Sequence, residues 1–293
     1  MRHIPVLQKE VLKYLDPKPN ENFIDGTIGG AGHARAILEK IKPDGKVLGI
    51  DLDEKAIEGI NDQNSKLENL ILVNDSYADL KKIVESEKFG PVSGILLDLG
   101  ISSFQIDESG RGFSFRKDEI LDMRFGIEKS GLTAEKVVND YSEEKIERIL
   151  REYGEEKFSK KIARKIAEER KIKPIKSALR LAEIVKKAAP GIYRGQKIHP
   201  ATRTFQAIRI EVNGELDNLR KVLPQSLEVL EKGARIVVIS FHSLEDRIVK
   251  NFFKEFSGAR LEILTKNPIT PDSEELKNNI RARSAKLRAA KII

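Results

Sequence analysis

Residues 25–38, DGTIGGAGHARAIL, decide the fold, because four glycines lie in a turn between an apolar run and a helical pattern. The preceding residues, ENFI, are typical of a short strand. In the segment AGHARAILEKI, the residues Ala34, Ile37, Leu38 and Ile41 share one helical face. The sequence therefore predicts a strand, a glycine-rich turn and a helix, with backbone that can approach a ligand closely at the turn.

The turn does not match the fingerprint of a dinucleotide-binding site. That fingerprint requires a third glycine or an alanine, and after Gly30 and Gly32 the third position is Arg35. Asp25 ends the strand, where its carboxylate would repel a pyrophosphate but attract an ammonium group. Asp51 ends the next apolar run, KVLGID, at the spacing of an acid that binds ribose hydroxyls. A nucleoside with a cationic amino-acid end, such as S-adenosylmethionine, satisfies both acids.

Composition narrows the class of protein. The chain has 293 residues, which is ample for a sizeable core, and it has no cysteine. Disulfides, thiolate metal sites and a cysteine nucleophile are thereby excluded. No run approaches the roughly 20 apolar residues of a membrane span, and the N-terminal residues lack the layout of a secretory signal. We therefore expect a soluble cytoplasmic protein with no membrane partner.

Positive charge is concentrated in one part of the chain. Residues 157–210 hold 16 Lys or Arg against three Glu, a surplus of 13, whereas the whole chain has a net charge of +7. The remainder is therefore acidic on balance. Such a cluster is either a solvated helix surface or a lobe that binds a polyanion, and the second reading is favoured.

Apolar runs ending near Asp25, Asp51, Asn74 and Leu99 alternate with helical patterns at first, which predicts a parallel sheet of α/β type. A further buried strand covers 234–241, and RLEILTK and SAKLRAAKII could form a closing pair. The long gap before residue 234 is helical in pattern, with Ser142 and Ser177 as expected helix starts and a stop at Pro190 and Gly191. We expect one domain from residues 1–106 and 210–293, and an inserted basic helical domain from residues 107–209.

Several polar and aromatic segments lie beside these expected strands. They are DLGISSFQIDESGRGFSF (98–115), DMRFG (122–126), HPATRTFQAIRIEVNGEL (199–216) and SFHSLEDRIVK (240–250). Asp98 ends a nearly all-apolar strand at the edge where open α/β sheets bind ligands. A position beside the reacting group is favoured for Asp98, and a cap for the following turn is the alternative.

These segments, together with HIPVLQKEVL, DGTIGGAGH, YGEE and RARSAKLR, closely resemble the MraW/RsmH family across residues 3–288. Small departures are Ala31, where the family usually has glycine, and Phe125, where methionine is common. The resemblance implies a Rossmann-like (class I) methyltransferase sheet with an inserted, mainly helical domain. It also implies transfer of a methyl group from S-adenosylmethionine to the exocyclic 4-amino group of a cytosine. That cytosine lies in the decoding region of small-subunit (16S) ribosomal RNA, the expected partner within the small ribosomal subunit.

The family correspondence extends the cofactor site. Asp51 is expected to bind the ribose, and no metal is expected. The acid at the end of the first strand and the glycine turn are included in the predicted site. The predicted cofactor residues are Asp25, Gly30, Ala31, Gly32, His33, Asp51, Tyr77, Asp98 and Gln105. His33 is the weaker case, because a histidine in a first helical turn is more often a backbone partner than a catalyst.

The missing cysteine also narrows the methylation chemistry. Methylating carbon 5 of cytosine generally needs a covalent cysteine, whereas an exocyclic amine needs only in-line placement and acceptors for its N–H groups. We expect Asp98, Ser102 and Ser103 to supply those acceptors. Aromatic rings interleaved with arginines suit an unstacked base, although the phenylalanines could instead anchor a loop to its own domain. The predicted substrate residues are Arg111, Phe113, Phe115, Arg124, His199, Arg203 and His242.

Two other functions remain open from the residues alone. One is a NAD-dependent oxidoreductase, which Arg35 and Asp25 disfavour. The other is a non-catalytic RNA-binding protein with a vestigial nucleotide fold, which would explain the basic region but not the acids of the pocket.

Overall fold

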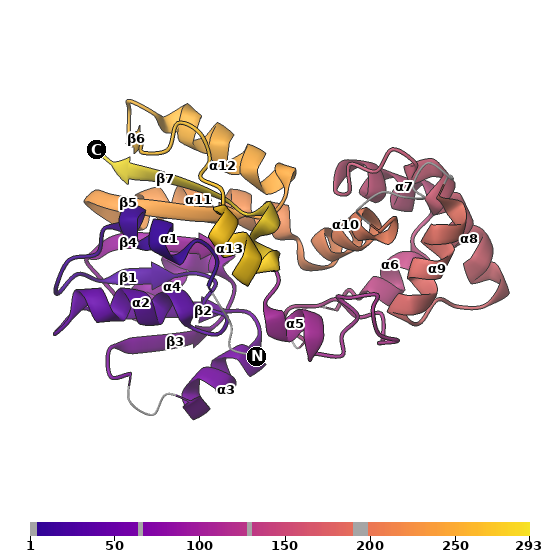
Figure 1. Ribbon diagram of the computed structural model, residues 1–293, viewed down its shortest axis with the longest axis horizontal. Coiled ribbons are helices and arrows are strands. Elements are labelled where there is room, and N and C mark those ends of the chain that lie inside the picture. The colour runs from indigo at the N-terminus through magenta and orange to yellow at the C-terminus, as the bar shows by residue number, and fades with distance from the viewer. Residues whose placement is uncertain (1–4, 64–66, 128–130, 190–198) are drawn as a thin grey trace. The chain divides into compact units, whose positions relative to one another are not determined.

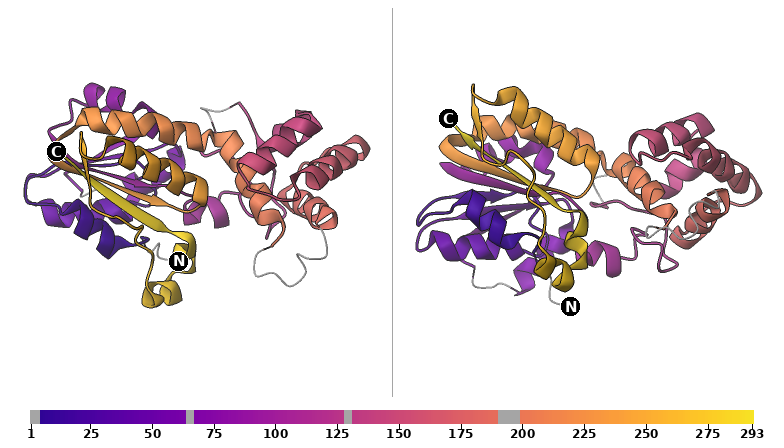
Figure 2. Two further views of the ribbon diagram at one scale, coloured as in Figure 1. Left: turned by 90° about the horizontal axis from the view of Figure 1, so that it is seen from above. Right: turned by 45° about the horizontal axis from the view of Figure 1, so that its top comes forward.

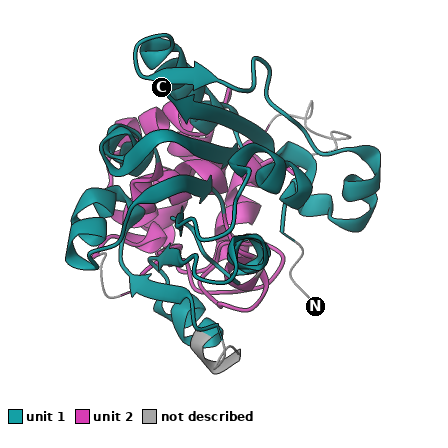
Figure 3. Cartoon of the chain, turned by 90° about the vertical axis from the view of Figure 1, so that its left-hand side faces the viewer, with its two compact units in different colours: residues 1–100, 216–293 teal, residues 101–215 magenta. Residues whose placement is uncertain are grey.

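The structure is a computed structural model that describes residues 5–63, 67–127, 131–189 and 199–293 (Figure 1). The chain divides into two compact units (Figure 3). Unit 1 consists of residues 1–100 and 216–293, and unit 2 consists of residues 101–215. The predicted boundaries followed residues 106 and 209. The assignment of cofactor binding to one part and substrate recognition to the other stays a prediction.

Unit 1 is built on one mixed sheet in the order β3-β2-β1-β4-β5-β7-β6. Neighbouring strands from β3 to β5 pair in parallel, whereas β7 is antiparallel to both β5 and β6. The strands are β1 (Phe23–Asp25), β2 (Val47–Asp51), β3 (Leu70–Asn74), β4 (Val92–Asp98), β5 (Leu230–Ser240), β6 (Leu261–Ile263) and β7 (Lys286–Ile292).

The strand ends predicted at Asp25, Asp51 and Asn74 are confirmed, and β4 ends at Asp98, one residue before the expected Leu99. The closing pair is confirmed too, as β6 and β7. The fifth strand begins earlier than expected, at Leu230, because Leu230 pairs with Val92 across an irregularity in the β4–β5 register. The exposed residues 231–233 hide this extension from an apolar pattern.

Helices cover both faces of the unit 1 sheet (Figure 2). They are α1 (Gln8–Leu15), α2 (Gly32–Ile41), α3 (Glu54–Gln63), η1 (Tyr77–Asp79), α4 (Leu80–Ser86), α11 (Glu215–Val229), α12 (Ser243–Phe256), α13 (Ser273–Asn278) and η3 (Ile280–Ser284). One core packs the apolar faces of α4, α11 and α12 against the sheet, and the other packs those of α1, α2 and α3. Alternate strand residues divide between the two cores: Ile24 and Leu97 enter the first, and Phe23 and Leu96 the second.

Unit 2 is mainly helical around a core of its own. Its helices are α5 (Ser103–Asp107), α6 (Ala134–Asp140), α7 (Glu143–Glu152), α8 (Ser159–Ile172), α9 (Ala178–Ala188) and α10 (Ala201–Asn213). The expected helix starts are confirmed, since the Ser142 and Ser177 side chains accept backbone N–H groups from Lys145 and Arg180. The expected stop at residues 190 and 191 lies outside the described residues.

No helix in the described part of the chain has both the length and the apolar character that a membrane span requires.

Candidate active site

Three acidic residues end three neighbouring strands of unit 1. Asp25 ends β1, Asp51 ends β2 and Asp98 ends β4, and β1 lies between the other two strands. The chain order reverses at β1, since β2 and β3 follow on one side and β4 and β5 on the other. The carboxyl ends of the strands at such a reversal form the usual ligand crevice of an open parallel sheet. The acids found in the sequence therefore meet at one edge.

Burial and nearby acidic groups disfavour the charged forms of two of these carboxyls, those of Asp25 and Asp51. Asp25 is 1% exposed, and burial raises its pKa to about 7, with further contributions from the charges of Asp98 and Asp51. Burial also raises the pKa of Asp51, to about 6. A cationic ligand at this edge would stabilise the ionised carboxylates, whereas a pyrophosphate would add to the repulsion. The electrostatics therefore favour a ligand that carries positive charge.

Asp51 also has a structural role. The backbone N–H of Gly29 donates to its Oδ2 at 2.9 Å, and the backbone N–H of Asp53 donates to its Oδ1 at 2.9 Å. The carboxylate thus fixes the glycine-rich turn to the end of β2. A ribose contact by Asp51 stays a prediction.

Thr27 connects two of the acids, and sequence reasoning missed it. Its Oγ1 accepts the backbone N–H of Asp98 at 2.7 Å, and its own N–H donates to Asp25 Oδ1 at 3.2 Å. The available signal was a short polar residue just after a strand-ending acid. Thr27 holds the ends of β1 and β4 in fixed relation.

Close packing limits the residue type at positions 31 and 32 of the glycine turn. Ala31 is fully buried with a φ of 59°, a left-handed conformation in which glycine would be less strained. A Cβ at position 32 would overlap the ring of Pro5. A glycine is therefore required at position 32 by its contact with the N-terminal segment. Gly30, in contrast, is exposed.

That N-terminal segment lies across the turn, which the sequence analysis did not foresee. The Gln8 side-chain amide donates to the carbonyl of Gly32 at 3.2 Å. The backbone N–H of Leu7 donates to Glu275 Oε1 of α13 at 2.7 Å. Two segments far apart in the sequence thus support the start of α2.

His33 lies in the first turn of α2 and faces the acids. Its Nε2 is 3.5 Å from Asp98 Oδ2, and the side chain is 6% exposed. Burial by itself lowers the pKa of His33, but the close contact with the Asp98 carboxylate and its charge, together with the charge of Asp25, raise it above its ordinary value. His33 is therefore the basic neighbour of Asp98 and Asp25, a contact that its place in the sequence does not reveal.

Tyr77 lies in η1 directly after β3. It is half-buried and packs against the core on one face of the sheet, and its Cβ lies near Gly26 at the end of β1. This position is next to the acidic edge, and an adenine contact stays a prediction.

Ser102 and Gln105 cap the short helix α5 in unit 2. The Ser102 Oγ accepts the backbone N–H of Gln105 at 3.1 Å, and Gln105 Oε1 accepts the backbone N–H of Ser102 at 3.0 Å. Gln105 is buried. The Ser103 side chain lies outside what the structure describes. Roles for these three residues in catalysis or cofactor binding stay predictions.

The DMRF and RGFSF segments pack into unit 2. Arg111 is 4% exposed, and its guanidinium donates to the carbonyls of Arg124 and Phe125. Phe113 stacks on Phe125 with 5.6 Å between ring centroids. Arg124 forms a bidentate ion pair with Asp122. Arg111 and Phe113 are thus anchored in the interior of unit 2, as the alternative considered for the phenylalanines expects. A substrate contact by either residue stays a prediction.

Phe115, His199 and Arg203 lie closer to the surface of unit 2. The His199 ring stacks on Phe115 with 4.6 Å between centroids, and Phe205 meets Phe115 edge to face. Burial lowers the pKa of His199, and the charge of Lys186 lowers it further. Arg203 is exposed and donates to the carbonyl of Glu155. These three remain candidates for substrate contact.

His242 caps α12 in unit 1. Its Nδ1 accepts the backbone N–H of Glu245 at 3.4 Å, and Glu245 Oε2 accepts the backbone N–H of His242. The side chain is 8% exposed. A substrate contact by His242 stays a prediction beside this structural role.

Known proteins are similar to this chain over its whole length. The model of the MraW methylase family matches residues 1–293. The chain belongs to the MraW methylase family. Proteins named ribosomal RNA small subunit methyltransferase H are similar to it: one from Kosmotoga olearia is 50% identical over 99% of this chain and 97% of its own, and one from Caldicellulosiruptor saccharolyticus is 46% identical over 99% of each.

A solved structure of the same fold is described as a "putative rRNA-methylase" from Clostridium thermocellum. It covers 100% of both chains with a TM-score of 0.50 and 12% identity. The predicted Rossmann-like fold is thereby confirmed. Membership of the MraW methylase family also confirms the prediction of a methyltransferase that uses S-adenosylmethionine, and it excludes the NAD-dependent oxidoreductase considered from the sequence.

The unit 1 edge fits the cofactor of a MraW family methylase. S-adenosylmethionine carries a sulfonium and an ammonium, and the edge offers the carboxyl groups of Asp25, Asp51 and Asp98 with the imidazole of His33 beside Asp98. Asp98 Oδ1 is buried without a hydrogen-bond partner among the described residues. A buried acceptor of this kind costs free energy unless a ligand supplies the donor.

Proposed function

We propose that the protein transfers a methyl group from S-adenosylmethionine to the exocyclic 4-amino group of a cytosine in the decoding region of 16S ribosomal RNA. The observation that supports an amine as the acceptor is Asp98, whose buried Oδ1 has no hydrogen-bond partner among the described residues and lies at the ligand edge of a methylase fold. A carboxylate there can accept an N–H of the amine as it meets the methyl group. The chain contains no cysteine for the covalent route to carbon 5.

Unit 1 is proposed to hold the donor. Asp25, Asp51 and Asp98 supply negative charge for its cationic groups. The backbone of the turn at residues 29–32 is proposed to contact the donor closely. The donor, when bound, supplies an electrophilic methyl group. No role for a metal is proposed.

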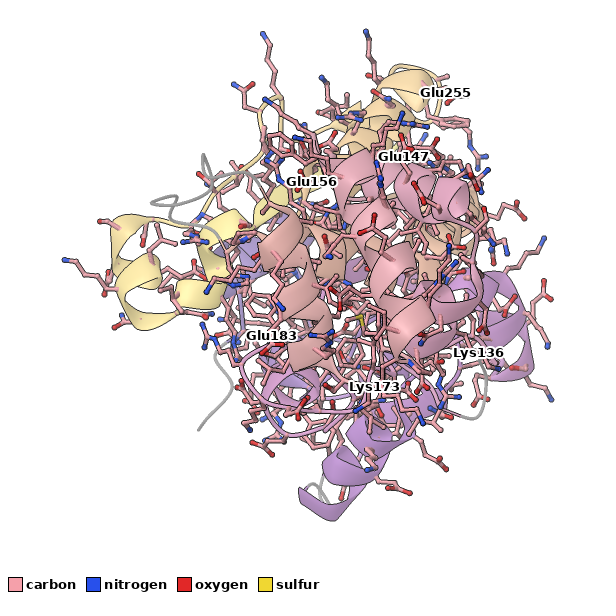
Figure 4. The ribbon with its side chains drawn as sticks, turned by 90° about the vertical axis from the view of Figure 1, so that its right-hand side faces the viewer. Lys136, Glu147, Glu156, Lys173, Glu183 and Glu255 are labelled. Carbon is pink, nitrogen blue, oxygen red and sulfur yellow. The ribbon has the colours of Figure 1, made fainter. Side chains whose placement is uncertain are left out.

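Unit 2 is proposed to recognise the RNA. Lys160, Lys161 and Lys171 of α8 are exposed and form no ion pair with the residues that the structure describes. Side chains of both signs cover this unit, with Lys173 and Glu183 labelled in Figure 4. Unpaired lysines on a helical unit are suited to folded RNA because each phosphate they neutralise releases counterions. Small ribosomal subunits are the proposed substrate particle, and a cytoplasmic site of action agrees with that substrate.

Methyl transfer to isolated small ribosomal subunits that lack the modification tests this function. After incubation with labelled S-adenosylmethionine, mass spectrometry of the digested RNA should find N4-methylcytidine in the decoding region. The Asp98→Asn variant should fold normally and transfer at least tenfold more slowly. Label on another base, on carbon 5 or on the ribose would overturn the assignment of the acceptor, and no transfer at all would favour the non-catalytic RNA-binding protein.

A further inference from the structure

His33 is a buried imidazole whose hydrogen-bonding capacity is unused. Neither its Nδ1 nor its Nε2 has a hydrogen-bond partner among the described residues, although Nε2 lies 3.5 Å from Asp98 Oδ2. A buried polar ring without hydrogen bonds lowers the stability of the folded state, so a functional role is expected for it. The long contact is of the type that tightens when a substrate complex forms.

The Asp98 backbone is already fixed, whereas its carboxylate is not. Thr27 Oγ1 accepts the Asp98 N–H at 2.7 Å, which holds the main chain at the end of β4. Of the two carboxylate oxygens, Oδ2 faces His33, and Oδ1 is buried without a hydrogen-bond partner among the described residues. One donor on Oδ2 would therefore set the rotation of the carboxylate and the direction of Oδ1.

The charged groups around His33 come from several elements. Asp98 of β4 and Asp25 of β1 are the nearest in effect, and Glu275 of α13 contributes more weakly. All three are acidic, so their charges raise the pKa of the His33 ring. Their charge favours a hydrogen on the ring nitrogen that faces Asp98.

We propose that His33 is a positioning residue: its Nε2–H holds Asp98 Oδ2, so that Oδ1 points to the acceptor amine of the substrate. The inference rests on the proposed function and specifies how its site is oriented. The amine nitrogen forms the new N–C bond with its lone pair, while the S–CH3 bond breaks and leaves its electron pair on sulfur. The extra proton on nitrogen passes to Asp98 Oδ1 and then to water, so charge and atoms balance.

The contact can be tested without substrate or cofactor. The chain has four histidines, so the ring resonances can be assigned and titrated by 15N NMR. In the wild-type protein His33 should carry a hydrogen on Nε2 in its neutral form and titrate above the ordinary range of histidine. Asp98→Asn should lower the pKa of His33, whereas Asp79→Asn, at an exposed position in η1, should not. If neutral His33 carries its hydrogen on Nδ1, or if its pKa is the same in Asp98→Asn as in the wild type, the proposed contact is wrong.

Single-turnover kinetics test the positioning. His33→Gln keeps an N–H donor and His33→Leu removes it, so we expect a roughly tenfold to hundredfold lower rate for His33→Leu and partial rescue by His33→Gln. The dissociation constant of S-adenosylmethionine, measured in parallel for each variant, separates a change in cofactor binding from a change in the rate of transfer. In His33→Leu the acid limb of the pH–rate profile should move to higher pH, because the carboxylates lose their cationic neighbour and retain protons longer.

The two proposals fail in different ways. If wild-type enzyme makes N4-methylcytidine but His33→Leu keeps the wild-type rate and pH profile, the positioning role is wrong and the proposed function stands. If the wild-type product is a different nucleoside, the proposed function is wrong, and the NMR titration still decides whether His33 holds Asp98. Should His33→Leu unfold, the Asp98→Asn titration of the wild-type ring decides the contact alone.

Discussion

Asp25 has a carboxyl group whose ionisation is controlled by the fold. Burial at the end of β1, next to two other acids, raises its pKa from 3.8 to about 7. The folded state therefore binds a proton that the unfolded chain has lost between these two pH values. The associated stability is complete below pH 4 and is lost as the pH rises through 7.

The Asp25→Asn variant should remove this dependence. The amide oxygen can still accept the N–H of Thr27, and no charge is buried. We expect the free energy of unfolding to exceed that of the wild type by up to about 4 kcal/mol above pH 7, and the difference to vanish near pH 4. Urea unfolding at pH 4, 6 and 8 measures it. A difference that is the same at all three values would show that Asp25 does not titrate between them.

Individual site residues were predictable where a strand end fixed them. Asp25, Asp51 and Asp98 could be found because each follows a strongly apolar run, and parallel strands bring their ends to one edge. Two contacts could not be predicted: that between His33 and Asp98, and the bridge made by Thr27. Both depend on the directions of side chains that come from different elements. The burial of Arg111 could not be predicted either, because a charged residue in a polar loop gives no sign of burial.

The glycine turn and α2 depend on the segment that packs over them. Pro5 occupies the space in which a Cβ at position 32 would lie, and this ring cannot move aside as a flexible side chain would. The sequence suggested that the glycines serve the ligand. At Gly32 the structure gives a packing reason instead.

Gly32→Ala should therefore destabilise the protein by about 1–3 kcal/mol, the usual cost of an overpacked site. Gly59→Ala in α3 is a matched control, because its Cβ would meet nothing within 4 Å and alanine favours helix. Thermal unfolding should show a lower Tm for the first variant and an equal or higher Tm for the second. Equal stability of Gly32→Ala and wild type would mean that the N-terminal segment moves away at little cost.

The charges of α8 are not equivalent. Arg164 pairs with Glu168, and Lys165 pairs with Glu168 and Glu169. Lysines on the same helix without such pairs are better placed to bind phosphate. The sequence showed the surplus of positive charge, but only the helix geometry shows which charges are already neutralised.

Replacing Lys160, Lys161 and Lys171 with Gln should weaken binding to small ribosomal subunits and reduce the slope of log K against log salt concentration by up to about 3. Binding of S-adenosylmethionine should not change. The double variant Arg164→Gln with Glu168→Gln leaves the net charge unchanged and should bind RNA as the wild type does. Filter binding at several salt concentrations measures the slopes. A wild-type slope in the triple variant would remove α8 from the RNA-binding surface.

The two units differ in how the chain builds them. Unit 2 is one continuous stretch, and the residues of its core come from within that stretch. Unit 1 is discontinuous, and β4 pairs with β5 from the other side of the insertion. The insertion itself was predictable from the long gap between two strand patterns. The sequence did not predict which apolar faces pack together in each core.

Residues 101–215 should consequently fold when expressed alone, with helical circular dichroism and a cooperative urea transition. Residues 1–100 serve as the contrasting case, because β4 then lacks β5 as its neighbour, and we expect no cooperative transition. A gradual, non-cooperative loss of helix in 101–215 would show that unit 2 needs unit 1 for its stability.

The position of β7 has a consequence for the growing chain on the ribosome. This last strand lies inside the sheet, between β5 and β6. The apolar faces of β1–β4 are synthesised first, yet their sheet stays incomplete until residue 292 has been added. At ordinary rates of translation the delay after unit 2 is on the order of ten seconds. An enzyme proposed to modify ribosomes thus leaves the apolar faces of these strands uncovered during synthesis, at the stage when nascent-chain chaperones act.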